Sequence, residues 1–167
     1  ISHNRESWDI ISIIDPIFTL PLVLFTVIAF VFRRPRFAQY AVALCLIYLS
    51  LGTYQQGQAT QFAAQIAEER GHEPEELSVR PSLANIMLWR IVYRSGDEYH
   101  VDAVRTTPFS DPKQYPGSIV DAFSEESAQI IAPEDSVLAD DIERFRFFSQ
   151  GYLYRYSDQA NVVADLR

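Results

Sequence analysis

The sequence predicts an α+β protein: a transmembrane helical hairpin followed by a small extracytoplasmic α+β domain with antiparallel strands. Two long apolar runs lie in the first part of the chain, with a short arginine-rich turn between them. The remainder is polar, acidic and interrupted by turn-forming residues. We therefore divide the chain into a membrane region, residues 1–70, and an acidic soluble α+β domain, residues 71–167.

The first apolar run predicts a transmembrane helix over about residues 10–32. No charged residue occurs from Ile17 to Phe32, although a bilayer-spanning helix needs about 20 residues. Extending the helix back to Ile10 supplies the missing length but places Asp15 inside the boundary. Pro16 suits the first turn of a helix, where its missing N–H costs nothing, and Asp15 is then suited to the N-cap position.

The second apolar run predicts a transmembrane helix over about residues 37–57 that extends to about residue 70. Between the two runs lie Arg33, Arg34 and Arg36. Basic turns between membrane helices favour the cytoplasmic side, so residues 71–167 are expected on the opposite side. The alternative is a pair of buried helices in a soluble protein, but three arginines in a four-residue turn favour the membrane.

The charge of the chain is unevenly distributed. Residues 1–70 carry five acidic residues and five arginines, whereas residues 71–167 hold the whole formal net charge of −8. Because such a domain has no basic stripe for a phosphate backbone, we expect no nucleic-acid partner. The single cysteine, Cys45, lies in an apolar run, which excludes a disulfide framework and a Cys-x-x-Cys metal pair.

The acidic half predicts about four strands and one well-defined helix. A β-hairpin is indicated around Ser95-Gly96-Asp97, and a helix by the apolar spacing from Val137 to Phe148, with Gly151 as its stop. A loop is expected over 71–82, with Gly71 as a helix C-cap, and a proline-rich coil over 106–118. A short helix is expected within 118–130, and Pro133 in the first turn of the later helix. Two strands are expected around the turn at 157–159.

Three stretches in this order resemble one known family. They are WDIISIIDPIFTLPL (8–22) ahead of the basic turn, RPSLANIMLWRIV with DEYHV (80–92 and 97–101), and FRFFSQGYLYRY with VVADLR (145–156 and 162–167). Together they are similar to the membrane-bound metal-dependent hydrolases, the YdjM-like inner-membrane proteins. The resemblance covers nearly the whole chain and corresponds to the C-terminal portion of that family.

The resemblance implies a bacterial inner (cytoplasmic) membrane protein that binds a divalent metal such as zinc. The family's histidine-rich motifs lie upstream of the matched region, so the main ligands are expected outside this chain, which we interpret as an internal piece of a longer protein. The implied reaction is attack of metal-activated water on a lipid or cell-envelope ester or phosphoester. The implied partners are membrane lipid and a lipid or small-molecule substrate.

Asp15 is the one residue of this sequence that we predict to take part in a metal site. Ionisable groups at membrane depth are costly and often functional, so Asp15 is a candidate ligand or partner of a ligand that faces the upstream histidines. The alternative is an N-cap worth about 1 kcal/mol. A function without catalysis also remains open, in which the chain is a membrane-anchored extracytoplasmic binding or scaffold module.

Other residues are expected to support structure or the site. Trp89 and Arg90 alternate across a strand, so one of them faces the core, and Asn85 is expected to hold a turn before them. Asp165 and Arg167 share a strand face and are expected to pair with each other, or Asp165 with Arg90. The three histidines, His3, His72 and His100, have no metal-ligand spacing and are expected to be structural or solvated.

Overall fold

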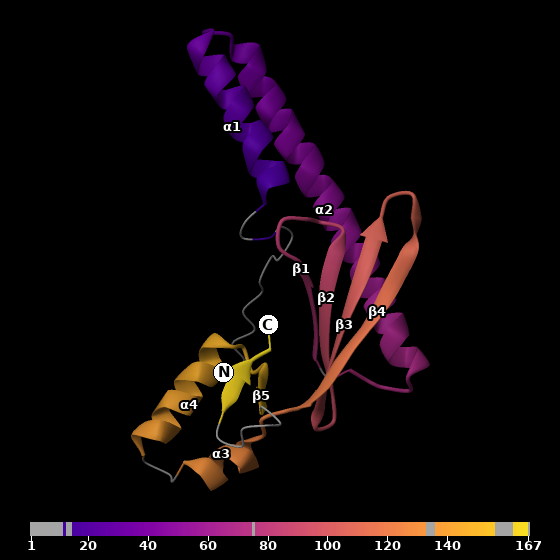
Figure 1. Cartoon of the computed structure of the whole chain (residues 1–167), viewed down its shortest axis with the longest axis vertical. Coiled ribbons are helices and arrows are strands. Elements are labelled where there is room, and N and C mark those ends of the chain that lie inside the picture. The colour runs from indigo at the N-terminus through magenta and orange to yellow at the C-terminus, as the bar shows by residue number, and fades with distance from the viewer. Residues whose placement is uncertain (1–11, 13–14, 75, 133–135, 156–161, 167) are drawn as a thin grey trace.

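The computed structural model describes residues 12, 15–74, 76–132, 136–155 and 162–166 (Figure 1). A two-helix hairpin projects from one end, and a four-stranded antiparallel sheet packs along the extension of its second helix. Two further helices and a small two-stranded sheet follow toward the C-terminus. The predicted α+β composition is therefore present, with helices first and antiparallel strands after them.

The hairpin consists of α1, Pro16–Val31, and α2, Pro35–Glu69. The expectation that the first helix begins near residue 10 is wrong for Ser12, which is not helical; residues 10, 11, 13 and 14 lie outside the described part of the chain. The helix begins at Pro16 because Asp15 adopts an extended backbone and caps the first turn. Arg33 has a φ of 51° in the turn between the helices.

The surface of the hairpin is apolar. No residue of α1 is fully buried, and large apolar side chains such as Leu20, Val27 and Phe30 are 68 %, 51 % and 84 % exposed. In the described part of the chain, α2 is the helix long and apolar enough to cross a membrane, while α1 is apolar but shorter, with 16 residues. A helix that is apolar on all sides is typical of a protein core or a membrane span.

The main sheet comprises β1, Glu76–Pro81, β2, Leu88–Ser95, β3, Glu98–Thr107, and β4, Ser110–Asp121, in the order β1-β2-β3-β4. The predicted hairpin turn is confirmed, and Gly96 has the positive φ, 60°, that such a turn requires. Two expectations are wrong, because β1 lies in the predicted loop and β4 covers most of the predicted coil. Both are edge strands, and an edge strand tolerates prolines such as those of β4 because one of its sides has no partner strand.

One face of the sheet packs on the C-terminal half of α2, and we call it the inner face. Its core joins Ala63, Ile66 and Ala67 of α2 to side chains of β2 and β3, namely Ile91, Tyr93 and Val104. Nearer α1, a second cluster joins Ala59 to Ile86 and Trp89. The β1–β2 and β3–β4 connections therefore point toward α1, while the β2–β3 turn lies near the end of α2 (Figure 1).

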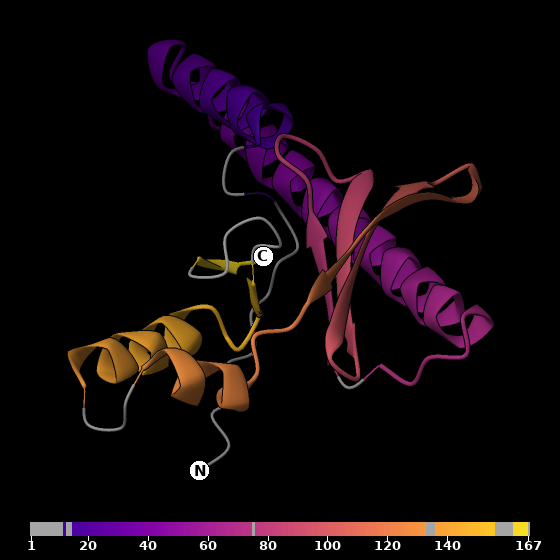
Figure 2. The ribbon, with the colours of Figure 1, turned by 60° about the horizontal axis from the view of Figure 1, so that its bottom comes forward.

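The opposite, outer face of the sheet carries the C-terminal segment. This segment contains α3, Glu125–Ile131, α4, Val137–Phe148, β5, Leu153–Arg155, and β6, Val163–Asp165. A cluster of Val92, Tyr99, Tyr152 and Leu166 joins it to the sheet, and α3 and α4 lie side by side away from α2 (Figure 2).

The predicted later helix is confirmed as α4. Ser136 caps it by accepting a hydrogen bond from the Ala139 N–H, and Gly151 after it has a φ of 87°. The short predicted helix is α3, whereas residues 118–121 belong to β4. The described residues contain six strands in total, two more than predicted; Pro133 and the turn at 157–159 lie outside them.

Candidate functional site

Asp15 is a buried carboxylate with two described hydrogen bonds. It is 4 % exposed; Oδ1 accepts the backbone N–H of Phe18 at 3.1 Å, and Oδ2 accepts the Tyr48 hydroxyl at 2.6 Å. The first bond is the N-cap interaction that the sequence predicts. The second was not predicted, since it joins residues 33 positions apart.

Tyr48 connects Asp15 to the sheet. Its ring lies 5.5 Å from that of Phe18, and it also packs against the cluster of Ala59, Ile86 and Trp89. The start of α1 therefore lies at the same level along α2 as the β1–β2 connection. The Asp15 carboxylate is thus joined, through the side chain of Tyr48, to the near end of the sheet.

Gln55 extends this polar row along α2. It lies seven residues, or two helical turns, after Tyr48 and so occupies the same helix face. Its side chain is 1 % exposed, and neither its amide oxygen nor its amide nitrogen has a hydrogen-bond partner among the described residues. An amide buried in this way costs free energy unless a partner reaches it, which makes the row of Asp15, Tyr48 and Gln55 the first candidate site.

The remaining predicted residues have separate roles. Trp89 is fully buried on the inner face and donates its indole N–H to Thr106 Oγ1 at 2.9 Å, while Arg90 is exposed on the outer face. Asn85 holds the β1–β2 connection as predicted, because its Oδ1 accepts the N–H groups of Met87 and Leu88 at 3.0 and 2.7 Å.

Asp165 is the last predicted residue that the structure describes. It is exposed at the end of β6, opposite Leu153. Its expected partner Arg167 lies outside the described residues, as does His3. The pairing of Asp165 with either arginine therefore stays a prediction.

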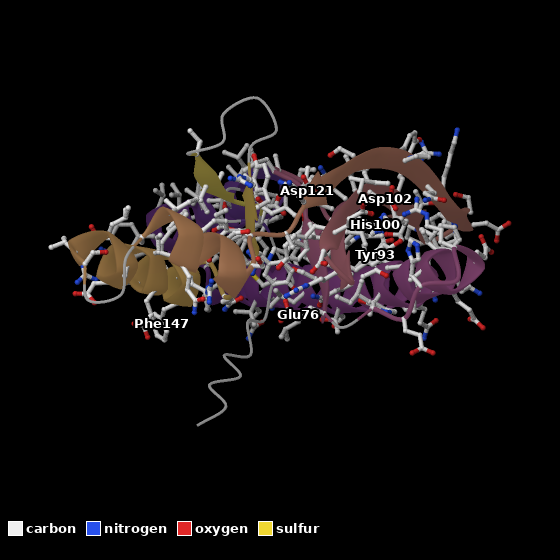
Figure 3. All side chains as sticks on the ribbon, turned by 90° about the horizontal axis from the view of Figure 1, so that it is seen from below. Glu76, Tyr93, His100, Asp102, Asp121 and Phe147 are labelled. Atoms are coloured by element: carbon white, nitrogen blue, oxygen red, sulfur yellow. The ribbon has the colours of Figure 1, made fainter. Side chains whose placement is uncertain are left out.

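A second polar cluster, which the sequence did not predict, lies between the end of α2 and the inner face. Its five residues are Arg70, His72, Tyr93, His100 and Asp102. Tyr93, His100 and Asp102 gather beside α2 in Figure 3. Arg70 forms an ion pair with Asp102 at 2.8 Å and donates to the Tyr93 hydroxyl at 3.0 Å. That hydroxyl lies 3.0 Å from His72 Nδ1. Because its oxygen accepts from Arg70, its O–H group is available to donate a hydrogen bond to this nitrogen.

Asp102 is the anchor of this cluster. It is 4 % exposed, and besides Arg70 it accepts the N–H of Gly117 at 3.0 Å and the Gln114 amide at 3.4 Å. A buried carboxylate needs such partners because ionisation in a dry interior is otherwise costly. Asp102 thus fastens β3 to both β4 and the end of α2.

The surroundings of His100 favour its neutral form. It is 5 % exposed, its ring stacks on Tyr93 with centroids 4.9 Å apart, and it lies 4.5 Å from the ring of His72. Burial lowers the pKa of His100, and the neighbouring His72 and Arg70 lower it further. A strand places residues 100 and 102 on one face, so the sequence did hold a partial signal for this cluster.

Neither site forms a complete metal centre from this chain. Among the described residues, no group of three histidine, cysteine, aspartate or glutamate side chains is arranged to hold a metal ion. Asp15 offers one carboxylate, and the Asp102 oxygens are already directed at Arg70, Gly117 and Gln114. Comparison with protein-family models, curated proteins and solved structures found no match to this chain.

Proposed function

We propose that this chain is part of a bacterial inner-membrane, metal-dependent hydrolase that acts on a lipid or cell-envelope ester or phosphoester. Its own contribution is to present Asp15 at the extracytoplasmic membrane boundary and to hold the sheet domain over that boundary. The observation that carries the proposal is the contact of Tyr48 with both Asp15 and the Ile86–Trp89 cluster. An acid and a substrate-facing domain would then meet where an amphiphilic substrate leaves the bilayer.

The continuity of α2 supports this arrangement. The helix runs without a break from Pro35 to Glu69, and the 21 residues that follow Tyr48 extend it about 30 Å past the level of Asp15 at 1.5 Å per residue. The sheet packs along this extension. A hairpin that spans the membrane, with Arg33, Arg34 and Arg36 in the cytoplasm, would therefore place the sheet at the outer surface.

The metal would require ligands from outside this chain. Because the described residues do not fit a complete metal centre, no step of the hydrolysis is assigned to a metal held by them. The role proposed for Asp15 is to contribute or orient one ligand. Its position is fixed by the Phe18 N–H and the Tyr48 hydroxyl.

Substitution of Asp15 in the full-length protein tests this role. Asn is as good an N-cap as Asp, because its Oδ1 keeps the bond from the Phe18 N–H. Its Nδ2 would then face the Tyr48 oxygen as a donor, and the charge is removed. We expect Asp15→Asn to retain thermal stability in mild detergent while the bound metal per protein falls at least tenfold. A variant that keeps both its stability and its metal would reject the role of Asp15.

A binding or scaffold module without catalysis is the second candidate. It is favoured by the exposed apolar side chains of α4, where Val137, Phe147 and Phe148 are 78 %, 61 % and 62 % exposed. Such a patch is typical of a protein contact. This candidate predicts that Asp15→Asn leaves function unchanged, whereas Phe147→Glu disrupts the assembly of the protein with its partner, measured by native mass spectrometry.

A further inference from the structure

At two places in the sheet, two cationic side chains lie directly opposite each other on neighbouring strands. Arg80 lies directly opposite Arg90 in the β1–β2 register, and Arg105 lies directly opposite Lys113 in the β3–β4 register. All four alternate with residues of the inner face, such as Trp89, so they occupy the outer face. Like charges directly opposite each other in an antiparallel pair are destabilising. Arg80 also donates to Gln150 Oε1 at 3.4 Å, so it is chiefly the mutual repulsion of Arg105 and Lys113 that an anionic partner would relieve.

The net charge of −8 on residues 71–167 predicts no basic stripe, so the grouping of these four cations on one face of the sheet is a local exception to that expectation. Arg90, Arg105 and Lys113 are exposed. Lys113 is held over the ring of Tyr115, with its Nζ 5.4 Å from the ring centroid. We call Arg80, Arg90, Arg105 and Lys113 the cationic face.

The cationic face includes a groove. A hollow of about 550 Å³ is lined by Ser78, Arg80, Pro81, Ser82, Leu83, Arg90 and Val92. Arginine guanidinium and serine hydroxyl groups are the donors that phosphate oxygens accept from, and the volume admits a phosphate with its ester substituents. The groove therefore offers donors to a phosphate ester, while Pro81, Leu83 and Val92 give it apolar walls.

The cationic face adjoins the end of the sheet that points toward α1. The two connections at this end expose Leu83, Met87 and Phe109, which are 73 %, 48 % and 98 % exposed. Ala84 holds a φ of 64° in the first connection, a conformation that is costly for a residue with a side chain. Ile86 in the same connection is buried beside Tyr48, at the level where α1 begins.

We infer that the cationic face binds the anionic phospholipid headgroups of the protein's own membrane, while Leu83, Met87 and Phe109 enter the interfacial layer. Apolar side chains beside cations at the end nearest the membrane helices match a lipid surface, which offers both phosphate and hydrocarbon. This inference rests on the proposed membrane-spanning hairpin. A sheet anchored at both α2 and the headgroups would keep a fixed height above the bilayer.

The experiment uses the chain in lipid nanodiscs with Cys45→Ser as the background. An environment-sensitive fluorophore is attached at Ser110→Cys, beside Phe109, or at Asp97→Cys, at the opposite end of the sheet. Quenching by a nitroxide on the lipid headgroup is compared between phosphatidylcholine and mixtures with phosphatidylglycerol. We expect strong quenching at residue 110 when phosphatidylglycerol is present and little at residue 97. The substitutions Arg105→Gln and Lys113→Gln should each lower the ratio of membrane-bound to unbound β3–β4 connection about fivefold, measured by the quenching at residue 110.

Each other outcome contradicts the inference. Equal quenching at residue 110 in both lipid mixtures would show that the cations do not recognise anionic headgroups. Absence of quenching in both mixtures would show that this end of the sheet does not contact the membrane. Loss of quenching on addition of soluble glycerol phosphate at low concentration would identify a free phosphate ester as the ligand instead. Extraction of the protein from membranes by alkaline carbonate would reject the spanning hairpin, and hence the proposed function, separately from the headgroup contact.

Discussion

Gly117→Ala is expected to be the most damaging small substitution in the sheet domain. A Cβ at this position would lie 2.1 Å from the Val101 carbonyl oxygen, whereas ordinary contacts begin at 3.4 Å. Strands β3 and β4 would have to separate by more than 1 Å, and overpacking of this kind costs about 1–3 kcal/mol. The same movement would stretch the hydrogen bond from the Gly117 N–H to Asp102, a bond to a charged group worth about 1.5–3 kcal/mol.

Together these effects predict a loss of about 3–5 kcal/mol, or a melting temperature lowered by roughly 6–20 °C in a chain of this size. The assay is thermal unfolding in mild detergent, followed by the fluorescence of Trp89, which is buried between the sheet and α2. Gly57→Ala is the matched control. A Cβ there has nothing within 4 Å, and alanine should stabilise the helix by about 0.5–1 kcal/mol.

A Gly117→Ala protein that melts within about 2 °C of the wild type would refute this reasoning. It would mean that β4 does not approach the Val101 backbone as described, and that Asp102 does not depend on the Gly117 N–H. Destabilisation of the same size in Gly57→Ala would instead point to a general sensitivity of the protein to substitution.

Three further predictions follow from the polar cluster around Asp102 and from the hairpin. Because the pKa of His100 is lowered on folding, the folded state binds fewer protons than the unfolded state, so stability is full above about pH 6.5 and falls as the pH drops toward the folded-state value. His100→Gln should flatten this decline in melting temperature, and an unchanged decline would show that another group causes it. Asp102→Asn should cost about 1–3 kcal/mol, reduced by the 30 % exposure of the Arg70 side chain, whereas Asp97→Asn in the turn should melt with the wild type. A periplasm-dependent reporter fused after Arg167 should be active, and activity of a cytoplasm-dependent reporter at that position would contradict the topology.

The elements predicted well from the sequence are those with strong local signals. Asp15 was predicted as an N-cap although the helix was expected to begin near residue 10, Gly96 marked the β2–β3 turn, and the apolar spacing from Val137 marked α4. In each case the signal lies within a few residues of the feature that it predicts, so tertiary contacts did not have to be known.

The elements predicted poorly depend on neighbours distant in the sequence. β4 carries Pro112, Pro116 and Gly117, which indicate a coil when the chain is considered alone. An edge strand accepts them because one side of it has no partner strand. The glycine is required by the approach of Val101 from β3, and this approach has no counterpart in the local sequence.

The candidate sites divide in the same way. Asp15 was identified from its place before an apolar run, but its bond with Tyr48 depends on how α1 packs against α2. The cluster around Asp102 was missed because Arg70 and Asp102 are brought together by the packing of the sheet on α2. Two histidines that lack helical ligand spacing gave no reason to expect contact, yet their rings are 4.5 Å apart.

The metal content of the full-length protein tests the proposed hydrolase most directly. The protein would be purified in mild detergent without chelators, and its bound divalent metals measured by inductively coupled plasma mass spectrometry. A stoichiometric divalent ion that is retained through size-exclusion chromatography is the predicted result. Full-length protein that is folded, as judged by its cooperative melting, and still holds no stoichiometric metal would contradict the proposal.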